Sequence, residues 1–213
     1  MGIIRQGVYG ALSGKTGNLI GASWRGIPYL RIMPASVANP RTPGQVNQRA
    51  KFRAVVAFVQ AQAAMISIGY RAYASGKTAA NAAVSYLLKT AITGTAPNFT
   101  VDYATALLSR GKLVKPAGQA VTATGLDASV TWNNNSSEGN ALPDDTAMLV
   151  AYNPTRLESF ILLEDTATRS EASLDFTIPA HFSGEEVKVY LAFRSADKRL
   201  ISDSVFVGSL TVA

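Results

Sequence analysis

The sequence predicts an α+β N-terminal domain, made of a glycine-rich β-hairpin and two helices, followed by an all-β sandwich. One reason is that helical patterns are confined to the first half, whereas the second half holds short strands separated by turn residues about every 8 to 12 positions. The other reason is charge. Residues 1–115 hold 14 Lys and Arg against one acid, a net of +13, and residues 116–213 hold six against 13, a net of −7. Because Pro116 and Gly118 punctuate this change, we expect two domains, 1–115 and 116–213.

The chain opens with short apolar segments between glycines. Residues 18–24 and 27–32 have the composition of two strands, and Arg25-Gly26 between them suits a tight hairpin turn, in which glycine supplies a positive φ. Glycines weaken strands that stand alone, so their frequency here indicates bulges or the close approach of another backbone.

A first helix is predicted from Pro43 to about Tyr73. Thr42 and Gln45 form a capping box, and Pro43 occupies the first helical position, where its missing N–H costs nothing. At 100° per residue the pattern has two sides. The apolar side holds Phe52, Val55, Phe58, Val59, Met65 and Ile66, and the polar side holds Arg49, Arg53, Gln60 and Arg71. Lys51 interrupts the apolar side, where its stem can snorkel to water.

A second helix is predicted from about Thr78 to Ile92, with Gly94 as its C-cap. We expect it to form an antiparallel pair with the first helix through the connection 74–76. Residues 99–108 alternate well enough to predict a strand.

Seven strands are predicted in the second half, at 121–124, 128–132, 147–152, 159–163, 173–178, 187–193 and 203–212. The segments Val130-Thr131-Trp132, Leu149–Tyr152, Val187–Phe193 and Ser202-Asp203-Ser204 resemble those of a fibronectin type III or immunoglobulin-like module, with a core Trp on an early strand and a Tyr on a late one. Such modules seldom carry out chemistry, so this resemblance implies adhesion, display or assembly.

The whole chain resembles a domain-of-unknown-function family associated with Bacteroidota and their phages. The resemblance rests on residues 1–7 (MGIIRQG), 13–18 (SGKTGN) and 24–26 (WRG), and on Asn39-Pro40-Arg41-Thr42 followed by Gln45, Gln48, Arg49 and Phe52. It implies a place in a phage particle and supplies no catalytic or binding residues.

Candidate catalytic, nucleotide and metal sites are weak. The chain has no Cys and one His, His181, which lies in a predicted turn without a paired nucleophile or carboxylate signature. The triplets at 14–16 and 76–78 (GKT) lack the earlier glycine of a phosphate-binding loop, because Tyr9 and Arg71 stand there. Glu138, Asp144 and Asp145 match no calcium-loop spacing, and turn chemistry explains them equally well. We therefore expect no enzyme activity, cofactor or metal.

The strongest functional feature is the basic first half. We predict a partner-binding surface that includes Arg25, Arg31, Arg41, Arg49, Lys51 and Arg53, with Trp24 and Tyr29 between them. This surface could be a solvated face, meet a phosphate backbone or meet an acidic protein surface. We favour the protein surface, because an acidic half on the same chain allows copies to dock basic half to acidic half, in a ring or a filament.

These observations predict a non-enzymatic structural or assembly protein, a homo-oligomeric subunit of a phage virion or phage-like particle. The alternative is a nucleic-acid-binding protein that uses the basic N-terminal domain. Glycan or receptor binding through the sandwich loops is a third possibility. No apolar stretch reaches the roughly 18 to 20 residues of a membrane span, and the N-terminus lacks a signal-peptide pattern. We therefore expect the protein in the virion or the cytoplasm.

Overall fold

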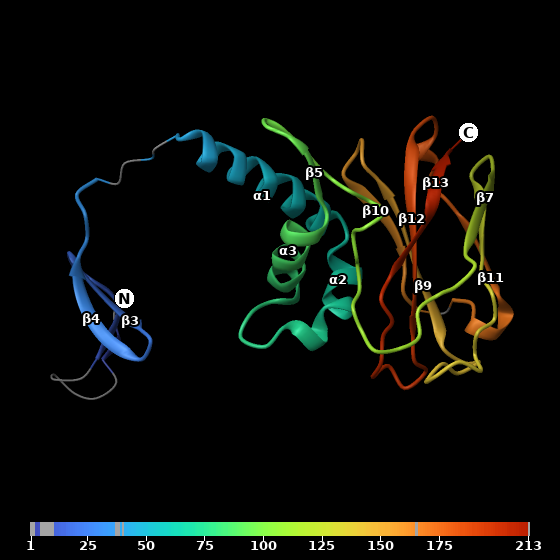
Figure 1. Cartoon of the computed structure of the whole chain (residues 1–213), viewed down its shortest axis with the longest axis horizontal. Coiled ribbons are helices and arrows are strands. Elements are labelled where there is room, and N and C mark those ends of the chain that lie inside the picture. Colours follow the sequence, from blue (N-terminus) through green and yellow to red (C-terminus); the bar gives the residue numbers. More distant parts are fainter. Residues whose placement is uncertain (1–2, 5–10, 37–38, 40, 165, 213) are drawn as a thin grey trace. The chain divides into compact units, whose positions relative to one another are not determined.

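The computed structural model describes residues 3–4, 11–36, 39, 41–164 and 166–212 (Figure 1). Helices and antiparallel strands in several sheets make it a mixed α and β fold. The chain divides into two compact units, Met1–Thr42 and Pro43–Ala213, which we call the N-terminal unit and the second unit. The predicted boundary between residues 115 and 116 lies inside the second unit, in a loop, and stays a prediction.

The N-terminal unit is an antiparallel meander in the order β1-β2-β3-β4. Its strands are β1 (Ile3–Ile4), β2 (Leu12–Thr16), β3 (Leu19–Trp24) and β4 (Ile27–Ile32). The two predicted strands are β3 and β4, and the predicted turn joins them. Arg25 and Gly26 have φ values of 49° and 83°, the two positive angles of a type I′ turn, whose twist suits a hairpin.

One glycine of this unit is approached closely by another backbone, as the sequence predicts. Gly21, on β3, is buried, and a Cβ built there would overlap the backbone oxygen of Leu12 on β2. Any side chain at position 21 would therefore push β2 away from β3.

The helices of the second unit are α1 (Pro43–Ala61), α2 (Ala63–Gly69) and α3 (Ala79–Thr90), with a single 3₁₀ turn, η1 (Arg71–Tyr73), after α2. The prediction of one continuous helix to Tyr73 is wrong, because the chain bends by 90° between α1 and α2. Gln62 at the bend has φ −122° and ψ 28°, outside helical values. A straight helix over both segments would be about 40 Å long. The longest strand beneath it spans about 30 Å, so the bend keeps both apolar faces on the sheet.

No single helix among the described residues is long and apolar enough to cross a membrane; α1 and α2 meet that test only when taken together across their bend.

The second predicted helix is confirmed as α3, and Thr78 caps it. The Thr78 hydroxyl accepts a hydrogen bond from the Asn81 N–H at 3.2 Å. The predicted C-cap at Gly94 is wrong, since the helix ends at Thr90 and Ala91 leads directly into β5 (Ile92–Thr95). Gly94 pairs instead with Phe99 of β6 (Asn98–Val101).

The predicted strand over residues 99–108 is too long, because β6 ends at Val101. The Asp102 carboxylate accepts hydrogen bonds from the Ala104 N–H and the Thr105 hydroxyl, both at 3.0 Å. These side-chain bonds favour a turn over a continued ladder.

All seven predicted strands of the second half are present, and their ends differ from the prediction by at most two residues. They are β7 (Ala120–Thr124), β8 (Asp127–Thr131), β9 (Thr146–Asn153), β10 (Glu158–Leu162), β11 (Ser173–Thr177), β12 (Glu186–Arg194) and β13 (Val205–Thr211). One sheet has the order β10-β9-β12-β13 and the other β11-β8-β7.

The second unit has three layers, with the four-stranded sheet in the middle (Figure 1). One hydrophobic cluster joins the two sheets and contains Trp132, Leu149, Phe176 and Phe193. A second cluster joins the helices to the other face of β9 and β12, through Met148, Val150, Tyr152, Tyr190 and Ala192. β9 is therefore buried on both faces, and this explains its uninterrupted apolar run.

A buried ion pair closes one end of the sandwich. The side chains of Arg169 and Asp145 are fully buried, with Nε and Oδ2 3.0 Å apart. The guanidinium also donates to the Asn135 side-chain oxygen and, at 2.9 Å, to the Val114 carbonyl, and it lies 3.9 Å from the ring centroid of Phe193. Burial lowers the pKa of Arg169, and Asp145 opposes this shift. One side chain thus links the connection before β7, the β8–β9 connection and β12.

Replacing Arg169 with Met should reduce the free energy of unfolding by about 3 to 5 kcal/mol, because Asp145 would stay buried and unpaired. Arg169→Met with Asp145→Leu should recover much of this loss, since no buried charge remains. Chemical denaturation measures both changes. The control is Arg199→Met, on an 85% exposed side chain paired with Asp197 at 3.7 Å, where we expect about 0 to 1 kcal/mol. Equal losses for the Arg169 and Arg199 variants would contradict the structural role of the buried pair.

Three tyrosines of the helix-to-sheet core make the fold sensitive to alkali. Burial raises the pKa of Tyr70, Tyr152 and Tyr190 well above the ordinary value near 10. The folded chain therefore keeps protons that the unfolded chain releases near pH 10. Their contribution to stability is complete below that pH and is lost as the pH rises above it.

We expect the free energy of unfolding to fall steadily above about pH 10. These three tyrosines should ionise only as the chain unfolds, so the last part of the tyrosinate absorbance rise should coincide with loss of the circular dichroism signal. Ionisation of all eight tyrosines near pH 10 with unchanged circular dichroism would show that the three are not protected.

Candidate partner-binding surfaces

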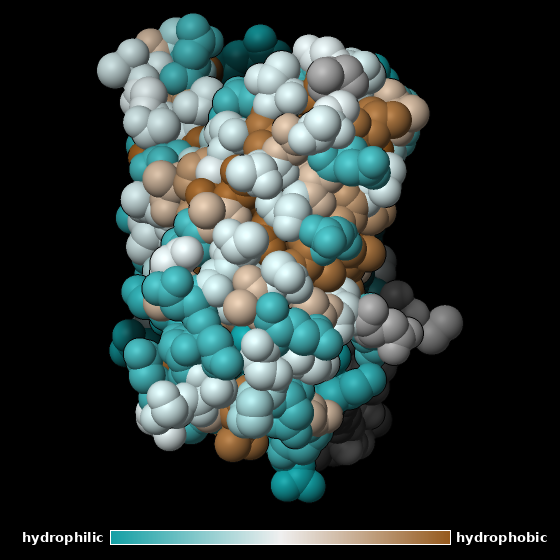
Figure 2. Space-filling view, turned by 90° about the vertical axis from the view of Figure 1, so that its right-hand side faces the viewer, coloured by the Kyte–Doolittle hydropathy of each residue, from teal (hydrophilic) through white to brown (hydrophobic). Residues whose placement is uncertain are grey.

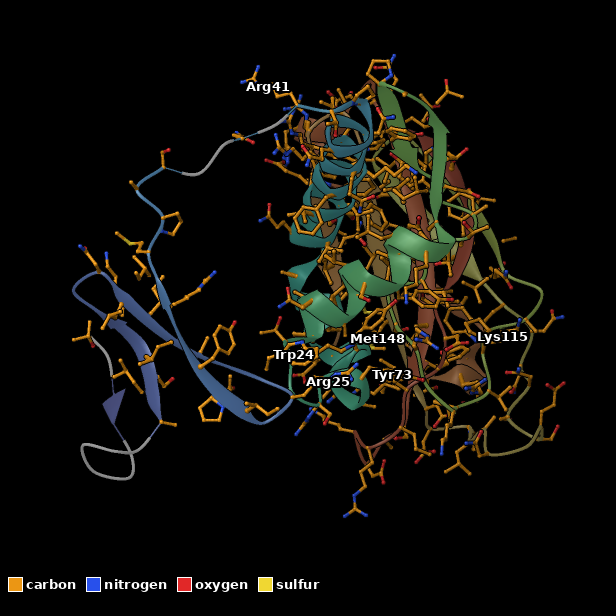
Figure 3. The ribbon with its side chains drawn as sticks, turned by 60° about the vertical axis from the view of Figure 1, so that its left-hand side comes forward. Trp24, Arg25, Arg41, Tyr73, Lys115 and Met148 are labelled. Atoms are coloured by element: carbon orange, nitrogen blue, oxygen red, sulfur yellow. The ribbon has the colours of Figure 1, made fainter. Side chains whose placement is uncertain are left out.

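The six basic residues predicted to bind a partner fall into two groups. Arg25 lies in the β3–β4 turn and Arg31 on β4, and Arg41 precedes α1 (Figure 3). These three belong to the N-terminal unit, whereas Arg49, Lys51 and Arg53 lie on α1 in the second unit. A single surface containing all six stays a prediction.

The α1 group borders a shallow hollow. Arg49 and Arg53 line it with Gln48 and Phe52, and its volume is about 420 Å³. Phe52 was expected on the apolar side of the helix and is 51% exposed, so that expectation is wrong. Helical periodicity aligns Phe52 with Val55, but it does not show how far along the helix the buried contacts extend, and Val55 is the first residue of α1 that is buried.

Lys51 points to the inner side of α1. Its residue is partly buried, and its ammonium lies 4.8 Å from the ring centroid of Phe99 on β6. A cation–π contact with Phe99 thus accommodates the charge on this side of the helix, and whether the stem snorkels to water stays a prediction. Lys51 therefore contributes charge to this side of the unit without projecting from it.

The helical side of the second unit is basic throughout. Between residues 43 and 101 the sequence holds no Asp or Glu, and its cations are Arg49, Lys51, Arg53, Arg71, Lys77 and Lys89. We call the segment from α1 to β6 the basic helical layer. A region of one charge sign attracts an oppositely charged surface and repels its own kind.

The outer face of the three-stranded sheet has the opposite character. Strand register places Thr122, Ser129 and Asp175 in one row and Thr124, Asp127 and Thr177 in the next. These residues line a hollow of about 450 Å³, and Figure 2 shows this side of the unit with white and teal residues over much of it. We call these six residues the acid–hydroxyl face.

The two carboxylates of this face lack cationic partners. The Thr177 hydroxyl donates to Asp127 Oδ1 at 2.9 Å. Within the described ranges, no Lys, Arg or His forms an ion pair with Asp127 or Asp175. Sequence reasoning missed this face, although Thr, Ser and Asp alternate with apolar residues in all three strands.

The N-terminal unit exposes a face that is both basic and aromatic. Strand register aligns Lys15, Ile20 and Arg31 across β2, β3 and β4. The next rows on the same face contain Tyr29 and then Trp24 with Ile27, and these three are 44%, 62% and 64% exposed. We call this set of residues the basic–aromatic face. At the turn beside it, the Arg25 guanidinium lies 4.9 Å from the Trp24 ring centroid (Figure 3).

The weaker candidates have local structural roles. Lys15 lies within β2, and Thr78 caps α3, so neither triplet forms a phosphate-binding loop after a strand. His181, in the 3₁₀ turn η3 (Ala180–Phe182), contacts the exposed Glu158 carboxylate at 3.2 Å. Asp145 is occupied by Arg169. In the part of the chain that the structure describes, no three metal-ligating side chains gather.

A family model, described as a family of unknown function (DUF6266), matches residues 11–208, so the chain belongs to this family. The expected membership of a family of unknown function is thereby confirmed. No curated protein and no solved structure matches the chain.

Proposed function

We propose that this DUF6266 member is a non-enzymatic structural protein that assembles with copies of itself, as a subunit of a phage virion or phage-like particle. The observation that carries the proposal is the position of two oppositely charged surfaces. The basic helical layer covers one side of the four-stranded sheet, and the three-stranded sheet with its acid–hydroxyl face covers the other.

Opposite placement determines the kind of contact that copies would make. If the basic helical layer of one copy meets the acid–hydroxyl face of the next, the first copy keeps its acid–hydroxyl face unused and the second keeps its basic helical layer unused. Such a heterologous contact continues into a ring or a filament and does not stop at a dimer. Each surface has a hollow, at Asp175 and at Phe52, into which side chains of a neighbouring copy could pack.

The topology of the sandwich supports a structural role. Seven antiparallel strands in sheets of three and four, around a buried Trp132, are what a fibronectin type III or immunoglobulin-like module requires. Sandwiches of this kind occur in many cell-surface domains. The phage particle itself is inferred from the resemblance of the N-terminal motifs.

Charge reversal tests the contact directly. Arg49→Glu with Arg53→Glu should dissociate multimers, and so should Asp127→Lys with Asp175→Lys, because each pair places like charges across the contact. A mixture of the two variants should form multimers again, since each altered surface now matches the other variant. Size-exclusion chromatography with light scattering at about 0.15 M salt measures this, and wild-type multimers should weaken near 1 M salt.

Lys115→Glu serves as the control for charge reversal, because Lys115 is exposed, belongs to neither surface and lines neither of the two hollows. It should leave the distribution of multimers unchanged. A wild-type chain that stays monomeric at high concentration would refute the proposal, and a mixture that does not reassemble would refute the assigned surfaces.

Nucleic-acid binding is a second candidate, favoured by the basic–aromatic face of the N-terminal unit. Proteins that bind single-stranded nucleic acids use exposed aromatic rings to stack on the bases and nearby cations to contact the phosphates. In that case the logarithm of affinity should fall steeply with the logarithm of salt concentration, and Lys15→Gln or Arg31→Gln should each reduce the slope by about 1. No retardation of single-stranded DNA or RNA at about 50 mM salt would dismiss this candidate.

A further inference from the structure

The N-terminal unit buries almost none of its own surface. Among its described residues with assigned exposure (11–36, 39, 41 and 42), only Gly21 is buried. β4 carries apolar side chains on both of its faces, and Leu30 and Ile32 are 59% and 75% exposed. An antiparallel meander without an apolar core needs another surface to stabilise it.

β4 also lies at an edge of the sheet. It is the last strand in the order β1-β2-β3-β4, and no other described strand pairs with it. An edge strand offers unpaired N–H and C=O groups that another strand can use. A partner at this edge would therefore be another extended strand that hydrogen-bonds to these backbone groups.

The strand register shows which backbone groups face outward. The Met33 N–H donates to the Asn18 carbonyl at 2.7 Å, which makes this the hydrogen-bonded type of pair. Because the two types alternate in an antiparallel ladder, Ile27, Tyr29 and Arg31 bond to β3. The N–H and C=O groups of Leu30 and Ile32 then point outward. Pro28 is also an outward position, so its missing N–H costs the β3–β4 pair nothing.

We propose that β4 pairs with β4 of a second copy, antiparallel and with Leu30 opposite Leu30. This inference rests on the self-association proposed above, but it uses a different contact. Leu30 residues exchange two hydrogen bonds, and each Ile32 N–H donates to the opposite Pro28 carbonyl, for about four bonds in all. On the face that holds Pro28, Leu30 and Ile32, the apolar residues of the two strands then form one continuous row across the contact.

Side-chain chemistry selects this register over its neighbours. With Leu30 on the two-fold axis, Arg31 lies opposite Tyr29 of the second copy, where a cation–π contact is available. A shift of two residues in one direction places Arg31 directly opposite Arg31, which is repulsive. The opposite shift draws Gly26 of the turn into the ladder. The strand is thus complementary to itself in one register.

Salt dependence separates this contact from the charge-driven one. Residues 11–42 hold Lys15, Arg25, Arg31 and Arg41 and no acid, so two N-terminal units repel each other. Salt screens this repulsion, and pairing through β4 should therefore strengthen as salt rises. Contact between the basic helical layer and the acid–hydroxyl face should weaken over the same range.

Disulfide trapping in the full chain tests the register, because the sequence has no Cys. In the proposed pair, the Cα atoms of the two Leu30 residues lie about 5.5 Å apart, within disulfide range, and those of the two Ile32 residues about 14 Å apart. At about 1 M salt, Leu30→Cys should form at least about fivefold more disulfide-linked dimer than Ile32→Cys under mild oxidation. Ile32 is the more exposed position, so random collision would favour the control.

Leu30→Pro provides a second test that leaves the β3–β4 bonds in place. It removes one outward donor and should abolish the association that persists at about 1 M salt, whereas Leu30→Ala, which keeps the donor, should weaken it less. Equal trapping of the two Cys variants would overturn the β4 contact. If multimers then still weaken with salt, the proposed function stands without it, and a monomer at every salt concentration would overturn both.

Discussion

The second unit depends on a guanidinium that lies entirely out of water. Arg169 could be buried only because Asp145, Asn135, the Val114 carbonyl and the Phe193 ring converge on it from separate parts of the chain. A buried charge without such partners costs several kcal/mol. The connection that leads from the helices into the sandwich is therefore held at Val114 by the same side chain that closes the sandwich.

Local sequence predicts the sandwich strands well and the helical layer less well, for physical reasons. The short strands are bounded by turn residues such as Gly125 and Gly184, which have positive φ values. Because these positions favour glycine, the turns can be recognised in the sequence between the alternating strand segments. The bend at Gln62 lies among good helix formers, so no local signal marks it, and only the sheet beneath requires it. The exposure of Phe52 has the same origin, since periodicity gives the direction of a side chain and not the extent of the surface it meets.

The candidate surfaces differ in the same way. The excess of cations before Asp102 is visible in the sequence, because charges are counted along the chain. The acid–hydroxyl face is hidden there, since β11 joins β8 and β7 only after about 40 intervening residues (residues 132–172). What the fold adds is the separation of the two signs by a complete sheet. The second unit therefore has cations on one side of the four-stranded sheet and carboxylates on the other, a division that its net charge does not reveal.

The double burial of β9 also has a consequence for motion. This strand is bonded to β10 on one side and β12 on the other, and both of its faces are covered. Its amide protons can exchange with solvent only when β10 or β12 separates from it, and the layers packed on both faces oppose that separation, so β9 should be among the slowest-exchanging strands of the second unit. The N-terminal meander has only Gly21 buried among its described residues, so we expect its amide protons to exchange much faster. The slowest and the fastest exchange in the chain should therefore divide between the two units.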